Sequence, residues 1–245
     1  MVICMNKVLF IVEGQTEQQI YENILGSALE PEILCEVAKT DITTNYDYSH
    51  YFGEGLILQF LKNKKIVDIK NYDYIIMITD TDGCFISDSD IIYSENKRVQ
   101  YTNTCIKTNK REKIIKRNRN KREKIDSLLN CYSVCGVTFK LFFNSTNLEH
   151  VMHNIQQVKR PEDKTKLALD ILKRYKGCEA DFLDFLKSSD ICSGRDYNDS
   201  WDYIGYGVHS LSRQTNLKFF LDEICKHRNR RKVNKMNIVK NETFK

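Results

Sequence analysis

Proline, glycine and long apolar runs are all scarce in this chain of 245 residues. Two prolines and ten glycines leave no Pro- or Gly-rich stretch that would act as a flexible linker between domains. No apolar run approaches the roughly 18 residues of a membrane-spanning helix, so we expect no membrane segment. The N-terminal residues read as a strand that enters a polar turn, and we therefore expect no secretory signal.

Cysteine occurs nine times, but no two cysteines form a CxxC pair. Structural zinc sites usually take their ligands from such pairs, so the spacing argues against a zinc site. An odd and scattered set also gives no disulfide framework. We expect most of the cysteines to be small buried apolar residues of a cytoplasmic protein.

Charge is unevenly distributed along the chain. Residues 107–124 contain ten Lys or Arg and two Glu, and residues 226–245 contain eight Lys or Arg and one Glu. Because the whole chain carries only +5, the remaining residues are strongly acidic. Basic segments on an acidic body suit phosphate binding beside a site for divalent cations. A solvated helix and a disordered tail are the plainer interpretation of the same two segments.

Apolar runs typical of buried strands alternate with amphipathic segments typical of helices. The strands are expected at residues 7–12, 33–38, 72–79 and 137–143, and the helices at 16–27, 54–63, 107–129, 147–157, 161–175, 179–187 and 214–226. Thr16 is expected to cap the first helix, with Gln19 as its capping-box partner. The helix at 107–129 reads as an extended charged arm, and residues 40–53 and 190–207 read as loops. The order predicts an α/β fold with a mostly parallel sheet flanked by helices.

Polar and acidic side chains follow three of these strands. Glu13 ends the first strand, Asp80 and Asp82 end the third, and the fourth leads through Asn144 to Glu149. Ligands of an open parallel sheet bind at the carboxyl ends of its strands, so these carboxylates are expected at one edge. Carboxylate oxygens are ligands that Mg²⁺ and Mn²⁺ prefer, and the pattern predicts a pocket for such a cation. Taken alone, a DxDG segment is more often an ordinary turn.

The order of these motifs resembles the Toprim domain, which topoisomerases, bacterial primases, the M5 type of ribosomal-RNA maturase and OLD-family nucleases share. The matching stretches are IVEGQTE, which contains Glu13, and IMITDTDG, which contains Asp80 and Asp82. IVEGQTE is more similar to OLD and RloB-type proteins of phage-defence systems than to primases. The resemblance implies a Toprim-like, Rossmann-like catalytic domain over residues 1–225, followed by a basic tail at 226–245. Within the domain it leaves a basic helical insert at about 96–130 and a helical part at about 160–225.

Two further segments resemble the RloB-type branch. NSTNLEH, which starts at Asn144 and leads on to His153, is similar to a segment in which an Asn-containing turn precedes a helix with Glu and then His. The aromatic residues usual around that Glu are replaced here by Leu148, His150 and Val151. QTNL at residues 214–217 resembles a Thr-Asn turn near the end of such proteins.

The resemblance implies metal-dependent phosphodiester chemistry. Asp80 and Asp82 would hold one Mg²⁺ or Mn²⁺, and Glu149 would help to hold a second. Glu13 would either join the metal ligands or act as general acid/base.

Two basic side chains are candidates for supporting roles at the predicted site. His153 would orient Glu149 or contact phosphate, although a half-buried surface histidine explains it equally well. Lys140 would neutralise phosphate charge from the same edge of the sheet.

The basic segment predicts contacts to a nucleic-acid backbone, with affinity that falls as salt rises. The residues expected to make these contacts are Lys107, Lys110, Arg111, Lys113, Lys116, Arg117, Arg119, Lys121, Arg122 and Lys124. The segment has few aromatic residues, so base stacking is not expected from it. Docking onto an acidic protein partner is the alternative use.

The resemblance thus implies a nuclease that cleaves RNA, such as tRNA, or DNA, and that serves as the toxic effector of an anti-phage system. Because the chain has no GxxxxGK[ST] motif, the ATPase that accompanies OLD-type relatives would be a separate protein. An RNA-processing maturase and a non-catalytic binding module remain alternatives. A homodimer is compatible with the resemblance.

Overall fold

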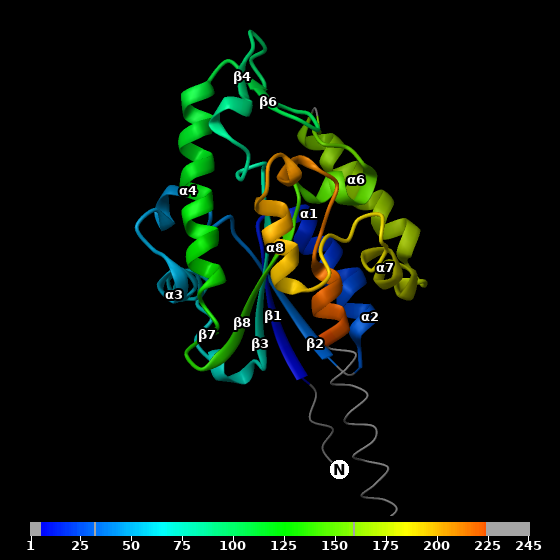
Figure 1. Ribbon diagram of the computed structural model, residues 1–245. Coiled ribbons are helices and arrows are strands. Elements are labelled where there is room, and N and C mark those ends of the chain that lie inside the picture. The colour runs from blue at the N-terminus through cyan, green and yellow to red at the C-terminus, as the bar shows by residue number, and fades with distance from the viewer. Residues whose placement is uncertain (1–5, 32, 159, 224–245) are drawn as a thin grey trace, which may run out of the picture.

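Four parallel strands form the centre of the protein in the computed structural model (Figure 1), which describes residues 6–31, 33–158 and 160–223. The central sheet has the order β2-β1-β3-β8-β7, and a small sheet has the order β4-β6-β5. The strands are β1 (Asn6–Val12), β2 (Ile33–Lys39), β3 (Tyr74–Asp80), β4 (Ile91–Tyr93), β5 (Gln100–Tyr101), β6 (Ile106–Thr108), β7 (Ser133–Val134) and β8 (Val137–Asn144). Only β7 runs antiparallel in the central sheet. The predicted α/β fold with a mostly parallel sheet is therefore confirmed.

Helices cover both faces of the central sheet, with α3 and α4 on one side and α1, α6 and α7 on the other (Figure 1). The α-helices are α1 (Gln15–Ile20), α2 (Ser27–Leu29), α3 (Gly53–Asn63), α4 (Arg111–Leu129), α5 (Leu148–His153), α6 (Pro161–Tyr175), α7 (Glu179–Leu186) and α8 (Tyr197–Gly205). A π-helical stretch, η1 (Tyr21–Gly26), joins α1 to α2, and 3₁₀ turns lie at η2 (Tyr46–Tyr48), η3 (Ile69–Asn71), η4 (Asp88–Asp90) and η5 (His209–Leu211). Residues 217–223 are also helical.

The central strands are buried on both faces, which explains their nearly continuous apolar sequences. Along β1, Val8, Phe10 and Val12 face a core shared with α1, α6 and α7. Leu9 and Ile11 face the opposite core, shared with α3, α4 and α8. Side chains alternate between the faces of a strand, so each residue of this run has a packing partner.

Helix α4 is part of the core, and the predicted extended arm is wrong. The helix begins at Arg111 because residues 106–108 pair as β6, and its buried face includes Ile125 and Leu128. The same face buries Lys121 and Lys124, although charged side chains are usually expected at the surface. The predicted insert at 96–130 is accordingly part strand and part core helix.

Other predicted features also differ from the structure. Helix α1 begins at Gln15 with Gly14 as its N-cap and no side-chain capping bond, so the expected Thr16 cap is wrong. Helix α8 lies within the expected loop at 190–207, where Asp196 accepts a hydrogen bond from the Asp199 amide and starts the helix. The predicted last helix begins at 217, and the predicted basic tail at 226–245 lies outside the described residues.

Among the residues that the structure describes, two of the seven free cysteines, Cys84 and Cys105, are buried. Cysteine burial is therefore less common than expected. None of the helices within the described ranges is long and apolar enough to span a membrane.

Replacing Ile125 with Ala should lower the free energy of unfolding by about 2–5 kcal/mol, because a fully buried side chain between α4 and the sheet is truncated. Urea unfolding followed by circular dichroism measures this loss. Ile92→Ala serves as the control, since Ile92 is 46% exposed, and it should cost well under half as much. Equal effects of the two substitutions would contradict the packing of α4 against the sheet.

Candidate active site

The carboxyl ends of the four parallel strands lie at one edge of the central sheet, and acidic residues gather there. The register pairs Val12 with Lys39 and Asp80 with Asn144, so all four strands end at nearly the same level. The acidic residues are Glu13 after β1, Asp41 after β2, Asp80 and Asp82 at the end of β3, Glu149 in α5, and Glu17 in α1. We call these six residues the carboxylate cluster.

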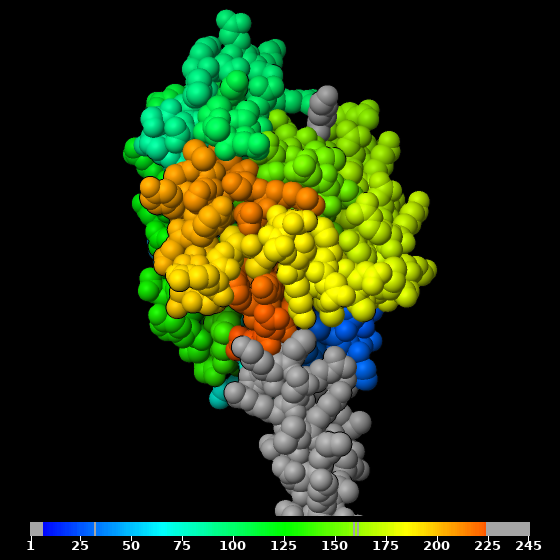
Figure 2. Space-filling view, turned by 45° about the vertical axis from the view of Figure 1, so that its right-hand side comes forward, coloured from blue at the N-terminus to red at the C-terminus, as the bar shows by residue number. Residues whose placement is uncertain are grey.

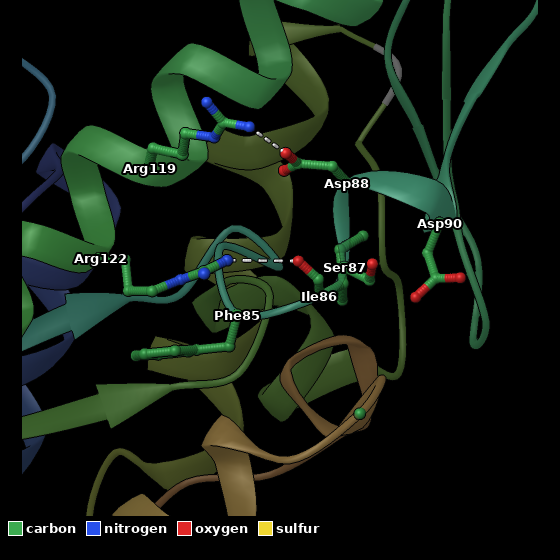
Figure 3. Close-up of a pocket in the computed structure, with 8 residues that line it drawn as sticks. Phe85, Ile86, Ser87, Asp88, Asp90, Arg119 and Arg122 are labelled. Carbon is green, nitrogen blue, oxygen red and sulfur yellow. Dashed lines mark hydrogen bonds and ion pairs between the residues drawn. The ribbon is translucent and has the colours of Figure 1, made fainter.

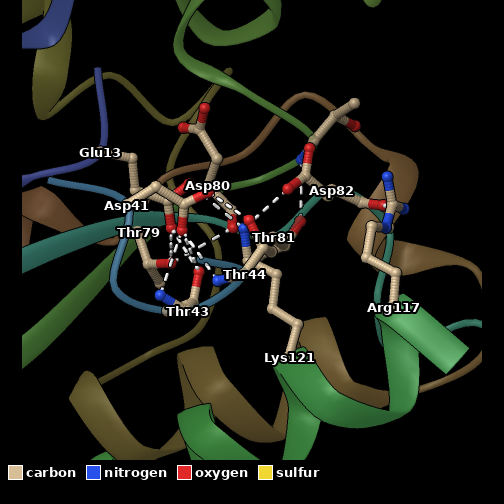
Figure 4. A network of polar contacts seen from close by, with 12 residues as sticks. Glu13, Asp41, Thr43, Thr44, Thr79, Asp80, Thr81, Asp82, Arg117 and Lys121 are labelled. Carbon is tan, nitrogen blue, oxygen red and sulfur yellow. Dashed lines mark hydrogen bonds and ion pairs between the residues drawn. The ribbon is translucent and has the colours of Figure 1, made fainter. Parts of the chain in front are cut away.

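Lys121 bridges two members of the cluster (Figure 4). Its Nζ lies 2.7 Å from Asp82 Oδ2 and 3.2 Å from Glu13 Oε2, and its side chain is completely buried. Thr79 and Thr43 both donate hydroxyl hydrogen bonds to the other oxygen of Glu13, Oε1. Glu13 is thus held between two hydroxyls and one ammonium group.

Burial and mutual repulsion keep several of these carboxyl groups from ionising at their usual pH. Burial raises the pKa of Glu13 to about 7, even though the charge of Lys121 acts in the opposite direction. Burial, and then the charges of Glu17 and Glu13, raise the pKa of Asp80 well above its usual range. Burial disfavours the charge of Lys121, but Asp82 and Glu13 outweigh it and raise the Lys121 pKa, so this side chain stays an ammonium ion.

Glu17 approaches the backbone of the turn that carries Glu13. A Cβ atom at Gly14 would lie 2.2 Å from Glu17 Oε2, so a side chain at that position would displace the Glu17 carboxylate. The Glu17 side chain is buried, and its pKa is raised, first by burial and also by the charge of Glu149. Because Gly14 has no side chain, the Glu17 carboxylate can lie beside the turn that carries Glu13, in the cluster.

Glu149 occupies the far side of the cluster and pairs with α6. Only 1% of its side chain is exposed, and Lys164 Nζ lies 3.1 Å from its Oε1. Its Oε2 has no hydrogen-bond partner among the described residues. A buried carboxylate oxygen without a partner is costly unless a cation or a donor reaches it.

The loop after β3 is fixed by the loop after β8. The amide of Thr81 donates to the Asn144 carbonyl, and the amide of Asp82 donates to the Thr146 carbonyl, both at 2.9 Å. Thr146 returns its own amide to Thr81 Oγ1 at 2.9 Å. Asp82 and Thr146 both have positive φ, at 50° and 59°. The Asn144 turn predicted from the sequence thus holds the DxD loop in shape, and Asn144 Nδ2 lies 3.4 Å from Asp80 Oδ1.

The TN segment of QTNL supports the same edge. Thr215 Oγ1 donates to the Phe143 carbonyl at 2.8 Å, and Asn216 Oδ1 accepts from the Phe143 amide at 2.9 Å. The segment continues the sheet beyond β7, which pairs only with residues 137 and 138 of β8.

The sequence motifs predict four members of the cluster and leave out Asp41 and Glu17. The structure brings Glu13, Asp80, Asp82 and Glu149 to one edge, as expected. Asp41 was read as part of a polar loop, although it follows the second strand just as Glu13 follows the first.

Glu17 was read as an ordinary helix residue. Its place three residues after Gly14, in the first turn of α1, is the signal that would have found it.

The two basic residues with expected supporting roles bond elsewhere, and His153 is half-buried, as in the alternative interpretation. Lys140 pairs with Glu223 and lies over the Tyr197 ring, at 5.8 Å from its centroid. It precedes the end of β8 by four residues, about 13 Å of strand. His153 Nε2 lies 3.1 Å from the carbonyl oxygen of Leu167 in α6.

The ten basic residues predicted to contact nucleic acid fall into two groups. The exposed ones are Lys107, Lys110, Lys113, Lys116 and Arg119. The other five bond groups within the protein, and burial corrects the predicted role of Lys121 and Lys124. Lys121 lies in the carboxylate cluster, and Lys124 donates to the carbonyls of Ile42 and Tyr48.

Three arginines of α4 hold the chain that follows Asp80. Arg117 donates to the Asp82 carbonyl at 2.9 Å, and Arg122 donates to the Cys84 carbonyl at 2.7 Å. Arg111 donates to the carbonyls of Asp88 and Ile91, both at 2.7 Å. The basic segment therefore fixes the loop that follows Asp80 through hydrogen bonds to its backbone, because guanidinium groups can bond several carbonyls at once.

The donor set fits Mg²⁺ or Mn²⁺ in its chemistry, because it offers hard carboxylate oxygens with uncompensated charge. Within the described ranges, no three His, Cys, Asp or Glu side chains are grouped closely enough to hold an ion together. Lys121 lies between Glu13 and Asp82, and Lys164 pairs with Glu149, so the cluster is divided by lysines. The predicted joint role of these residues as metal ligands stays a prediction.

The raised pKa of Glu13 should make stability depend on pH. The folded protein binds the Glu13 proton more tightly than the unfolded chain, so this contribution is full below pH 4.5 and is lost as the pH rises to about 7. The Glu13→Gln variant lacks this loss, and its stability relative to the wild type should increase by on the order of 3 kcal/mol across that interval. Urea unfolding at stepped pH measures the difference. The exposed control Glu123→Gln should follow the wild type, and parallel profiles for Glu13→Gln would refute the shift.

Known proteins give no further information on this site. A scan against protein-family models, a search of curated proteins and a search of solved structures each find no match for the chain. The carboxylate cluster must therefore be interpreted from its own geometry, and the Toprim resemblance stays a prediction based on the sequence motifs.

Proposed function

We propose that the protein is a Mg²⁺- or Mn²⁺-dependent nuclease whose active site is the carboxylate cluster. The observation that carries the proposal is the gathering of six acidic residues from the ends of three neighbouring strands and from α1 and α5, with the pKa of Asp80 raised well above its usual range. Acidic groups are rarely buried together without a function that needs them, because each raises the cost of ionising the next. A divalent cation would offset that cost.

The residues divide between holding a cation and moving a proton. We assign Asp80, Glu17 and Glu149 as the ligands that would move together around the cation, because Glu149 Oε2 lacks a partner among the described residues and the charges of Glu17 and Glu149 interact. When bound, the ion would supply electrostatic stabilisation to the scissile phosphate. Glu13, with a pKa of about 7, suits a general acid/base that exchanges a proton with the attacking or leaving oxygen. Lys121 positions Glu13 and Asp82.

The substrate would approach along the N-terminal part of α4. Lys113 and Lys116 are exposed on this helix, and Lys107 and Lys110 lie just before it. Ammonium groups of this kind bind phosphates without regard to sequence. We propose RNA such as tRNA, or DNA, as the substrate. In a phage-defence setting, a separate ATPase would control the enzyme, and the protein would act alone or as a homodimer.

A non-catalytic nucleic-acid-binding module is the second candidate. The observation that favours it is the bridge made by Lys121, which already neutralises Glu13 and Asp82 without an ion. In that case the cluster would be a structural ion-pair network, and carboxylate substitutions would change stability alone.

Asp80→Asn should reduce cleavage by at least about 100-fold, because it removes a proposed cation ligand from the centre of the cluster. The assay incubates the purified protein with labelled tRNA, duplex DNA and single-stranded DNA, with Mg²⁺, Mn²⁺ or EDTA. Added Mn²⁺ should also raise the melting temperature of the wild type and leave that of Asp80→Asn nearly unchanged. An RNA-processing maturase would cleave one structured RNA and leave the other substrates intact.

Asp181→Asn is the matched control for the cleavage assay, since Asp181 is exposed on α7, away from the cluster. It should cleave and respond to Mn²⁺ like the wild type. Cleavage that persists in Asp80→Asn, or that continues in EDTA, would refute the assigned site. No cleavage of any substrate, together with no melting shift, would favour the binding module.

The double variant Lys113→Ala, Lys116→Ala should bind nucleic acid more weakly and with a salt dependence shallower by up to about 2 in log–log slope, because two phosphate contacts are lost. Binding titrations in EDTA between low and moderate salt measure the slope. The control is Lys62→Ala, Lys64→Ala at the end of α3, where both lysines are also exposed. An unchanged slope in the α4 variant would assign these lysines to protein docking or to solvent.

A further inference from the structure

An exposed group of aromatic rings lies on the segment that follows α8. We call Tyr203, Tyr206 and His209 the aromatic patch. The Tyr203 and His209 rings are stacked, with centroids 4.1 Å apart and an interplanar angle of 16°. Tyr206 is 76% exposed, and its ring centroid lies 5.9 Å from that of His209. Stacked and exposed rings provide flat surfaces on which further planar groups can stack.

The aromatic patch shares a rim with a pocket beneath the small sheet. This pocket has a volume of about 420 Å³, and Gly207, which follows Tyr206 directly, forms part of its wall. Phe85, Asp88 and the guanidinium groups of Arg119 and Arg122 line other parts of it (Figure 3). In the space-filling view, the orange segment that carries the patch lies directly against the blue-green segment after β3 (Figure 2).

The pocket and the patch are connected to the carboxylate cluster through the chain and through a hydrogen bond. The pocket wall begins at Phe85, three residues after Asp82. The carbonyl of Ser210, next to His209, accepts a hydrogen bond from Thr81 Oγ1 at 3.1 Å.

The lining of the pocket suits a nucleobase better than a bare phosphate. Asp88 and Asp90 balance the charges of Arg119 and Arg122, and Arg119 is paired with Asp88. Carboxylate and guanidinium groups side by side offer both acceptors and donors, as the edge of a base requires. Phe85 adds an apolar ring. Bases present their faces and edges in this way only when they are unpaired.

We propose that the aromatic patch and this pocket together bind unpaired nucleotides of a single-stranded nucleic acid, and so select the substrate that enters the carboxylate cluster. Only the role in substrate selection rests on the proposed nuclease function, because binding itself can be measured without cleavage. It also supplies the base stacking that the basic segment lacks, since the rings come from residues 203–209.

The test measures binding in EDTA by fluorescence anisotropy. The probes are labelled RNA and DNA single strands of about 12 nucleotides and a duplex of the same length. The wild type should bind single strands more tightly than duplex. Tyr206→Ala should weaken single-strand binding by about 10-fold and leave duplex binding unchanged, whereas Tyr206→Phe, which keeps the ring, should bind like the wild type.

Tyr132→Ala is the matched control, because Tyr132 is 78% exposed and lies beside β7 at the opposite edge of the sheet. It should bind like the wild type. Failure of the wild type to bind single strands, equal affinity for duplex, or an unaffected Tyr206→Ala variant would each overturn the proposal. A preference for RNA or for DNA among single strands identifies the natural source. Loss of cleavage in Asp80→Asn with single-strand binding intact would separate this surface from the carboxylate cluster.

Discussion

The bridge from Lys121 to Glu13 and Asp82 is the interaction on which the arrangement of this edge depends. It links α4 to the ends of β1 and β3 through one fully buried ammonium group. Removing one partner from a buried ion pair typically costs about 3–5 kcal/mol, because the remaining charge is left without compensation. Removing the Lys121 ammonium group would leave two carboxylates, those of Glu13 and Asp82, without compensation. The bridge therefore ties the position of the insert helix to the electrostatics of the cluster.

The cluster combines two kinds of acidic group. Asp41 accepts bonds from the amides of Thr43 and Thr44, and its pKa is lowered, despite burial, by the charge of Lys121 and by bonds from the Thr44 hydroxyl and amide and the Thr43 hydroxyl. Within the described ranges Asp80 accepts one long side-chain bond, from Asn144 Nδ2 at 3.4 Å, and its pKa is raised by burial and by neighbouring carboxylates. Pairs of acids pushed in opposite directions are a common basis for dividing acid and base roles. The proposed nuclease would use this contrast to separate proton transfer from cation binding.

The sequence was sufficient to predict the central strands and the acidic residues that follow β1, β3 and β8, whereas Asp41 after β2 was not predicted. A run such as VLFIV is accommodated only by a strand buried on both faces, which is the position of a central strand in a three-layered α/β protein. The burial of one face of α4 was not predictable in the same way. Lys121 and Lys124 become buried because carboxylates and carbonyls from residues 13, 42, 48 and 82 meet them, and such partners are distant in sequence. Helix α8 was missed because its apolar positions, such as Trp201 and Ile204, are few and lie in a Gly/Asp/Tyr-rich segment.

Helix α4 carries surface lysines on one side and the internal counter-charge of the cluster on another. The two tasks are interleaved within a single helix, since Lys116 is exposed and Lys121 is buried less than two turns later. Deleting α4 to remove the proposed nucleic-acid contacts would therefore also remove the counter-charge of the acidic edge. Substitutions of individual exposed lysines can separate the two, and the same coupling limits how freely the segment can diverge or be engineered.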